Sequence, residues 1–198
     1  MLHTANPEHE LWSSSGEKQG VQCFTSKSGD PCAMGIGVVR APMRAVHAVI
    51  MDLENRQRLD PQFESGRRVQ RVDEHTVVDY LKFKRVWPTT ARDFCNLSHW
   101  RVRRDGSMLV VAHGVEHPDA PPVKGCVRAM LHIGGYILRP LEGGRATEVV
   151  YMVQTDLRGS VPQAVVSMVA AKQPLVVAAL RKVAEAMDHG PFLAAGPP

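Results

Sequence analysis

The first motif with a spacing that could do chemistry is His113-Gly-Val-Glu-His117, which matches the H-x-x-E-H zinc pattern of a group of metalloproteases. That chemistry needs a helix to bring both histidines to one metal ion. Here Val110-Val-Ala112 precedes the motif and Pro118 follows it, a context that is typical of a strand end. Residues four apart on a strand lie ~13 Å from each other. We therefore interpret the match as chance and expect no metal site.

Other catalytic and cofactor patterns are incomplete. Gly35-Ile-Gly37-Val-Val-Arg40 lacks the third glycine of a dinucleotide loop and lies within a predicted strand. The sequence contains no G-x-S-x-G motif, no Walker loop and no Cys–His pairing at a recognisable spacing. Because no nucleophile and base can be named, we predict no catalytic residues, no cofactor and no enzymatic activity.

Asp79 points to binding rather than catalysis. Strand alternation places it on the same face as Val77, Leu81 and Phe83. A carboxylate among apolar side chains is costly unless it is paired or protonated. Asp79 therefore either lines a pocket or, if the strand faces the other way, lies in solvent. Alternation decides which residues share a face but not where that face points.

The composition is that of an ordinary globular domain. The chain has 198 residues, 44% hydrophobic and 22% charged, which suits one domain with a substantial core. The net charge of +4 is only mildly basic, so we expect no nucleic-acid partner. The same charge allows a weak attraction to anionic membrane surfaces.

The expected compartment is the cytoplasm. The N-terminus, Met1–Pro7, has neither a basic nor an apolar signal region, and the uncharged stretch Ser160–Ala171 is too short to span a membrane. The cysteines show no C-x-x-C spacing, and we expect them to be reduced. They are Cys23, Cys32, Cys95 and Cys126.

The elements that must position these residues are mainly strands from residue 19 to residue 157. The predicted strands are 20–26, 34–40, 66–72, 76–84, 92–103, 108–116, 127–138 and 146–156, with a turn at 27–31. Short helices are predicted at 43–53 and 54–60. Long consecutive strands joined by short turns imply an antiparallel meander.

A long amphipathic helix ends the chain. Ser160 and Gln163 suggest a capping box at its start, and Pro174 should kink it in the middle. Its apolar stripe has to cover a large curved sheet. The outcome is either a solid α+β core or a cavity between helix and sheet.

Lys84-Arg-Val-Trp-Pro88, followed by Arg92-Asp93-Phe94, resembles the "WP…RDF" signature of START (StAR-related lipid-transfer) domains. Further motifs of the family occur in the family's order along the chain. One precedes this signature, at 52–60 (with Leu59 replacing the usual Trp), and three follow it, at 117–128, 134–140 and 151–162. The resemblance implies the α+β helix-grip fold of START and Bet v 1-like domains. In that fold a curved antiparallel sheet and a long C-terminal lid helix enclose a hydrophobic cavity for one lipid. We expect this domain at residues 11–189, with tails at 1–10 and 190–198.

The resemblance also implies lipid contacts, although no subgroup's full head-group set is present. Ser98 replaces an arginine of the sterol- and phosphatidylcholine-binding members, as it does in ceramide-binding ones. The ceramide group's polar positions fall on Leu81 and Ala112, its acid on Asp60 and its tyrosine on Tyr151. Sterol-binding members keep an acid at the position of Asp79. The implied lipid-binding residues are thus Asp60, Asp79, Leu81, Ser98, Ala112 and Tyr151. They favour a phospholipid or sphingolipid over a sterol.

Trp87-Pro88 forms the predicted tip of a loop between two strands. An exposed tryptophan suits a membrane interface, and Lys82, Lys84 and Arg85 flank it. The alternative is a tryptophan packed under its own loop. We interpret Arg92 and Asp93 as a charged pair that anchors the loop rather than as ligand contacts.

Together these features predict a monomeric, cytoplasmic lipid-binding domain that contacts membranes transiently. Its expected role is to extract one lipid and carry it between membranes. An alternative is a lipid-sensing or targeting module within a larger protein, which the shortened N-terminal part favours. A third reading, an enzyme acting on a hydrophobic substrate, is disfavoured because no nucleophile and base can be named.

Overall fold

The computed structural model describes residues 11–27 and 32–194. Most of the predicted turn 27–31, the predicted N-terminal tail 1–10 and the last four residues of the predicted C-terminal tail 190–198 therefore lie outside the described residues. The strands are β1 (Trp12–Lys18), β2 (Val21–Ser26), β3 (Cys32–Val39), β4 (Phe63–Arg71), β5 (Thr76–Phe83), β6 (Ala91–Val102), β7 (Met108–Gly114), β8 (Cys126–Arg128), β9 (Met130–Leu141) and β10 (Ala146–Asp156). The helices are α1 (Met43–Met51), α2 (Arg56–Leu59), α3 (Gln163–Lys172), α4 (Val176–Glu185) and α5 (Gly190–Ala194). Single 3-10 turns are η1 (Leu53–Asn55), η2 (Glu142–Gly144) and η3 (Gln173–Leu175).

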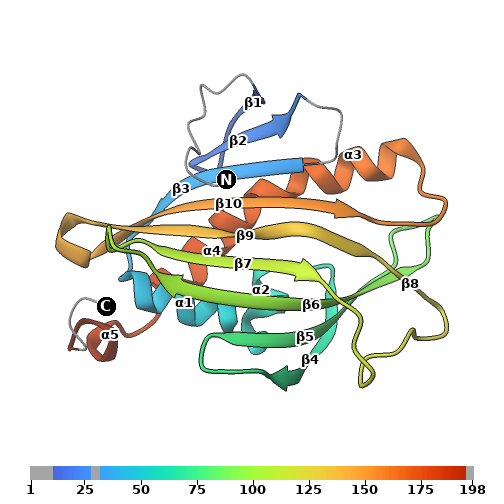
Figure 1. Ribbon diagram of the computed structural model, residues 1–198. Helices are drawn as coiled ribbons and strands as arrows, with labels where there is room; N and C mark the ends of the chain where they lie inside the picture. Colours follow the sequence, from blue (N-terminus) through green and yellow to red (C-terminus); the bar gives the residue numbers. More distant parts are fainter. Residues whose placement is uncertain (1–10, 28–31, 195–198) are drawn as a thin grey trace.

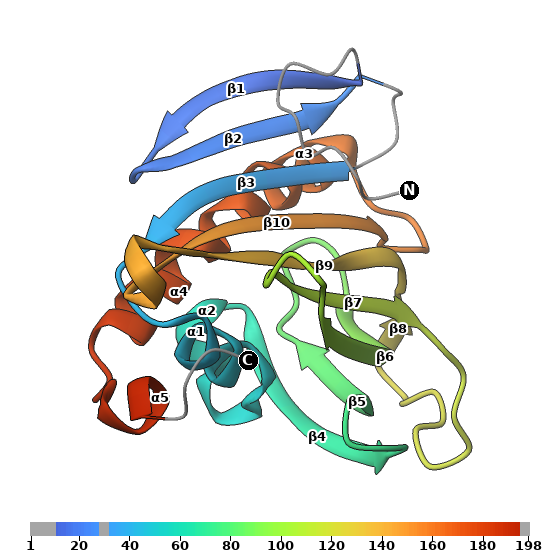
Figure 2. The ribbon, with the colours of Figure 1, turned by 60° about the vertical axis from the view of Figure 1, so that its left-hand side comes forward.

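The strands form one strongly curved sheet, and the helices lie on its concave side (Figure 1 and Figure 2). The order is β1-β2-β3-β10-β9-β7-β6-β5-β4, with every neighbour antiparallel, and the short β8 pairs with β6 in parallel. Strands β4 to β7 follow one another in sequence and in space, as expected of a meander. The predicted α+β architecture of a curved antiparallel sheet with a C-terminal helix is confirmed.

Strand alternation divides the sheet into an inner face, which the helices cover, and an outer face. Inner-face residues join α1 and α4 in the largest core cluster; among them are Met108, Val110, Tyr136, Leu138, Val149 and Tyr151. The outer face carries smaller clusters around Met34 and around Val78. Because the period of a strand is two, the register of each pairing assigns every side chain to one of these faces.

The C-terminal helix breaks where Pro174 predicts a kink. Helix α3 ends at Lys172, the 3-10 turn η3 contains Pro174, and α4 continues from Val176. Helix α4 buries one apolar face against the sheet and α1, with Leu180 fully enclosed. Helix α3 is different, because it has no fully buried residue. The two halves of the lid are therefore anchored unequally.

Glycine allows the lid to lie close to the sheet at the kink. A Cβ atom on Gly35 of β3 would lie 2.6 Å from the carbonyl oxygen of Pro174. No larger residue fits this contact without moving backbone. The sheet therefore admits η3 at this point only because position 35 has no side chain.

Several sequence-based expectations need correction. The N-cap of α3 is Pro162, and no side chain caps the helix, so the predicted capping box of Ser160 and Gln163 is wrong. Strand β1 was not predicted because its Ser-rich residues are mostly exposed and show no apolar alternation. Strand β4 begins at Phe63 rather than at residue 66. In the predicted C-terminal tail, Gly190–Ala194 forms the short helix α5.

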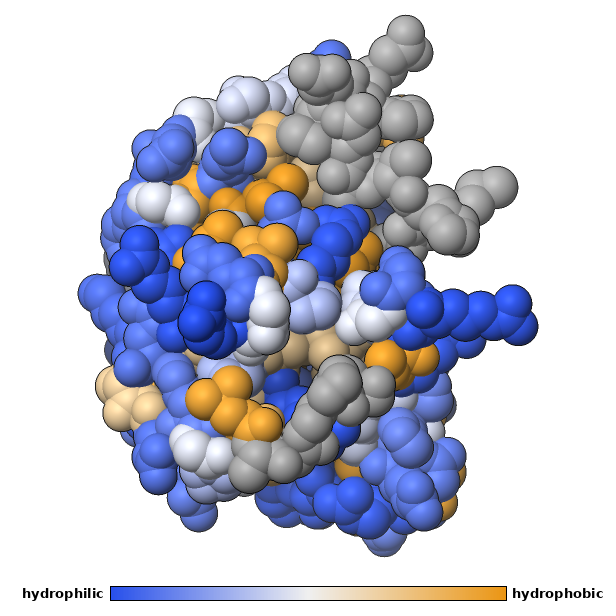
Figure 3. All heavy atoms as spheres, turned by 90° about the vertical axis from the view of Figure 1, so that its left-hand side faces the viewer, coloured by the Kyte–Doolittle hydropathy of each residue, from blue (hydrophilic) through white to orange (hydrophobic). Residues whose placement is uncertain are grey.

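The two ends of the molecule differ in character. Figure 3 shows the end that carries α5 and the turn between β9 and β10, where hydrophobic side chains form a patch among hydrophilic ones. At the opposite end, the start of β6, the end of β10 and the start of α3 lie together (Figure 1). That second end contains the loop with Trp87.

Candidate functional site

Five of the six predicted lipid-binding residues lie on the inner face of the sheet. Their registers place them on the concave side: Leu81 pairs with Phe94, and Ser98 pairs with Ala112. They are Asp79 and Leu81 on β5, Ser98 on β6, Ala112 on β7 and Tyr151 on β10. The sixth, Asp60, is the C-cap of α2. The fold thus brings five of these positions onto one concave surface.

Asp79 is buried and fully engaged by Arg68 of β4. The Arg68 Nε donates to Oδ1 at 2.9 Å, and Nη2 approaches Oδ2 at 3.3 Å. The same Nη2 donates to the carbonyl oxygen of Met51, at the end of α1, at 3.2 Å. Arg68 therefore supplies the donors that a carboxylate on an apolar strand face needs. The charged pair also ties the sheet edge to α1.

The pairing with Arg68 decides the outcome that we expect for Asp79→Leu. The variant would leave the Arg68 guanidinium, whose side chain is 29% exposed, without its carboxylate. We expect the free energy of unfolding to fall by about 1–3 kcal/mol. This is less than the loss for a fully buried charge, because water still reaches part of the Arg68 side chain. Urea denaturation of the lipid-free protein measures it. The double variant Arg68→Met, Asp79→Leu is the matched control and should recover most of the loss. Single and double variants of equal stability would contradict the pairing.

Two tyrosines form the polar centre of the inner face. The rings of Tyr136 and Tyr151 lie 4.9 Å apart, and the Tyr151 hydroxyl donates to Oε1 of Gln173 in η3 at 3.0 Å. Burial raises the pKa of both phenols, that of Tyr151 well above its usual value, whereas the nearby charge of Arg56 lowers them. Both hydroxyls therefore remain protonated donors. The Tyr151 bond connects the sheet to the kink of the lid.

Arg56 and Asp60 of the short α2 segment face this tyrosine pair. The Nε atom of Arg56 is enclosed and has no hydrogen-bond partner among the described residues. The Asp60 carboxylate accepts from the backbone N–H of Gln62 at 2.8 Å and raises the pKa of both tyrosines. Asp60 was predicted as a site residue from the sequence and Arg56 was not, although Arg56 lies within the same 52–60 motif. Arg56 and Asp60, both half-buried, thus bring two charges of opposite sign close enough to affect the tyrosine hydroxyls.

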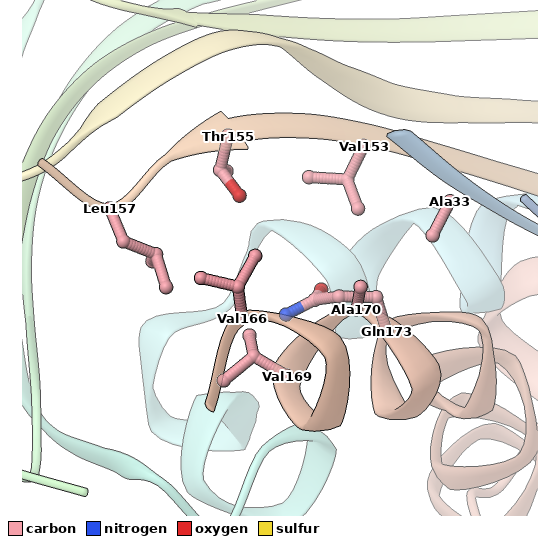
Figure 4. Close-up of a pocket in the computed structure, with 8 residues that line it drawn as sticks. All are labelled: Ala33, Val153, Thr155, Leu157, Val166, Val169, Ala170 and Gln173. Carbon is pink, nitrogen blue, oxygen red and sulfur yellow. The ribbon is translucent and has the colours of Figure 1, made fainter. Parts of the chain in front are cut away.

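A small apolar cavity separates α3 from the sheet. Figure 4 shows Val153, Thr155 and Leu157 pointing toward the helix and Val166 pointing back, while the Gln173 side chain lies along the helix. The cavity holds about 20 Å³, roughly the room of one water molecule. Small-molecule pockets span about 300–1,000 Å³. A lipid can enter beneath α3 only if this helix separates from β10. Because α3 has no fully buried residue, little packing opposes that movement.

The loop between β5 and β6 exposes its tryptophan. The Trp87 side chain is 81% exposed, which rules out the alternative of a ring packed under its own loop. Of the flanking cations, Lys82 pairs with Glu64 at 2.6 Å, and Lys84 donates to the carbonyl oxygen of Pro61 at 2.9 Å. Arg85 is exposed. The loop therefore presents an aromatic ring and at least one available positive charge.

Arg92 and Asp93 anchor the ends of this loop, but they do so with other partners than each other. Arg92 donates to the carbonyl oxygens of Leu157 and Arg158 at 3.1 and 3.0 Å, which joins the loop to the segment before α3. Asp93, fully buried, accepts from Nε of Arg128 on β8 at 2.9 Å. The predicted structural role fits these contacts, whereas a mutual pair does not. The loop and the start of α3 are consequently held at one end of the molecule.

The family of the chain follows from comparison with known proteins. The model of the START domain matches residues 2–187, so the chain belongs to the START family, as predicted. The structure superimposes on the human StAR-related lipid transfer protein 5 with a TM-score of 0.80 and 26% identity, covering 90% of this chain and 88% of that one. Membership places the chain among lipid-binding domains rather than enzymes.

Sequence relatives extend beyond this chain. It is 35% identical over 146 residues to the protein ENHANCED DISEASE RESISTANCE 2-like of Arabidopsis thaliana, which covers 69% of this chain and 20% of that protein. It is 27% identical over 145 residues to START domain-containing protein 10 of Homo sapiens, covering 73% of this chain and 48% of that protein. The chain thus spans about a fifth to a half of the length of these relatives.

Proposed function

We propose that the chain binds one lipid between the inner face of its sheet and the lid formed by α3 and α4, and transfers it between membranes. The observation that carries this proposal is the inner face itself. Buried polar side chains, among them Asp79, Asn96 and Ser98, sit within an otherwise apolar concave surface, and helix α3 on the same side of the sheet has no fully buried residue. Such a surface suits a ligand with a long apolar body and one polar part.

Membrane contact would occur at the end of the molecule that carries Trp87. Helix α3 starts at this end and presents apolar residues on all sides, with Met168 39% exposed. By length and composition alone, Gln163–Glu185 would suffice to cross a membrane, yet its second half, α4, packs on the sheet. An exposed tryptophan and a half-exposed apolar helix at one end favour docking in the interface rather than spanning.

The ligand favoured by the inner face is a phospholipid or sphingolipid before a sterol. Ser98 stands where sterol-binding relatives have an arginine that would pair with an acid. In this chain Asp79 already has Arg68 at 2.9 Å, so its charge is neutralised without the ligand. A sterol hydroxyl would therefore meet Ser98 and an Asp79 that is already paired with Arg68, instead of the acid–arginine pair of the sterol-binding relatives.

A lipid-sensing or targeting module of a larger protein is the alternative. The coverage of the relatives supports it, because the chain matches only 20% of the plant protein and 48% of the human one. The same lipid site would then report lipid content rather than deliver cargo. Lipid binding without net transfer between vesicles would favour this alternative.

The test of the proposed function combines two measurements on the purified chain. Native mass spectrometry of protein from cells is expected to show one lipid per chain, and labelled lipid should move from donor to acceptor liposomes when the protein is added. The lipid-free protein serves as the mass reference. A chain that carries no lipid and takes none from vesicles of any lipid class would refute lipid binding.

A further inference from the structure

Strand β6 carries two adjacent polar side chains on the inner face, Asn96 and Ser98. Phe94 and Trp100 flank them on the same face and pack against the main core cluster. Asn96 is only 8% exposed and Ser98 9%. Two polar groups thus interrupt an apolar strand face in the interior, about 7 Å apart along the strand.

One side-chain atom of Asn96 is unpaired within the described part of the chain. Its Oδ1 atom is enclosed and accepts no hydrogen bond there. An unpaired buried amide is costly, and the great majority of such groups in folded proteins are paired. Asn96 therefore needs a partner that the chain does not supply.

The neighbouring strands explain why the chain supplies none. The Cα partner of Asn96 on β5 is Asp79, whose two carboxylate oxygens face Arg68. Its Cα partner on β7 is Gly114, which has no side chain. The Arg68–Asp79 pair is also neutral overall, so the position next to Asn96 offers no uncompensated positive charge to a phosphate.

Resting on the proposed lipid-binding function, we propose that Asn96 is a specificity-determining residue that binds an uncharged polar group of the lipid. That group both donates and accepts hydrogen bonds, because a primary amide and the nearby Ser98 hydroxyl each offer both. A lipid hydroxyl or a secondary amide has this chemistry. A phosphocholine head group has acceptors only, and it leaves the Asn96 acceptor unpaired.

The experiment compares wild-type protein with Asn96→Leu, an apolar replacement of similar volume. The probes are a fluorescent ceramide, with amide and hydroxyls, a fluorescent diacylglycerol and dehydroergosterol, each with one hydroxyl, and a fluorescent phosphatidylcholine. We expect Asn96→Leu to weaken binding of the best donor-bearing probe about tenfold, the loss of one hydrogen bond. Phosphatidylcholine binding should not change, and the melting temperature of the empty protein should be unchanged or higher. The ranking of the first three probes identifies the source of the donor.

Controls separate the possible failures. Leu97→Ala alters the outer face of the same strand and should leave the probe ranking unchanged, and Asn96→Ala replaces the leucine variant if that variant does not fold. Equal losses for all probes, or no loss for any, would overturn the role of Asn96. A wild type that binds phosphatidylcholine alone would overturn it while leaving lipid binding intact. A wild type that binds none of the probes and takes no lipid from vesicles of any other class would refute the proposed function itself.

Discussion

Trp87→Ala is expected to weaken association with liposomes more than tenfold and to leave the melting temperature nearly unchanged. The ring is 81% exposed, so the fold gains little from it. Inserting half of its roughly 200 Å² into the membrane interface contributes about 2.5 kcal/mol at about 25 cal/mol per Å². Co-sedimentation with anionic vesicles measures association, and thermal unfolding measures stability.

The matched control for Trp87 is Leu193→Ala in α5. Leu193 is 53% exposed and belongs to the opposite end of the molecule, where Figure 3 shows a patch of hydrophobic side chains. If any exposed apolar residue promoted association, both variants would weaken it. Association lost only in Trp87→Ala assigns docking to the loop. Wild-type association in that variant, or a large drop in its stability, would refute membrane contact by Trp87.

Gly35→Val is expected to lower the free energy of unfolding by about 2–3 kcal/mol, because the new side chain must push η3 away from β3. The contact is with backbone: an added Cβ lies 2.6 Å from the Pro174 carbonyl oxygen and 3.0 Å from its Cα. Neither atom can move without the lid. For a domain of this size the melting temperature should fall by roughly 4–12 °C.

The same variant should release bound lipid faster than wild type, since the displaced kink also separates Gln173 from Tyr151. Dissociation of a fluorescent lipid into excess vesicles measures the rate. Gly37→Ala is the control on the same strand, because the nearest atoms there are side-chain atoms of Val177 and Arg181 that can rearrange. If Gly35→Val matched Gly37→Ala in stability and release, the close approach at Gly35 would not hold the lid.

Interactions local in sequence were predictable. The period-two pattern of 76–84 placed Asp79 and Leu81 on one face, and the structure has both on the inner face of β5. The apolar spacing in 43–53 matches α1, and Pro174 interrupts the C-terminal helix. Each of these depends on backbone geometry within a few residues. Where local signals competed, prediction failed: Pro162 occupies the N-cap position of α3, so Ser160 cannot act as its cap.

The identity of the fold was also present in the sequence, because the START motifs occur in family order across most of the chain and the family model matches residues 2–187. The hydrogen-bond partners of the inner-face residues, by contrast, could not be predicted from the sequence. Arg68 reaches Asp79 across a strand pair with bulges on either side of it, between Phe63 and Ser65 and between Arg68 and Gln70. Each bulge shifts the alternation by one residue, so no periodic pattern could assign Arg68 to a face. The Tyr151–Gln173 bond and the unpaired Asn96 amide likewise depend on which strands and helices meet in space, and only tertiary packing decides that.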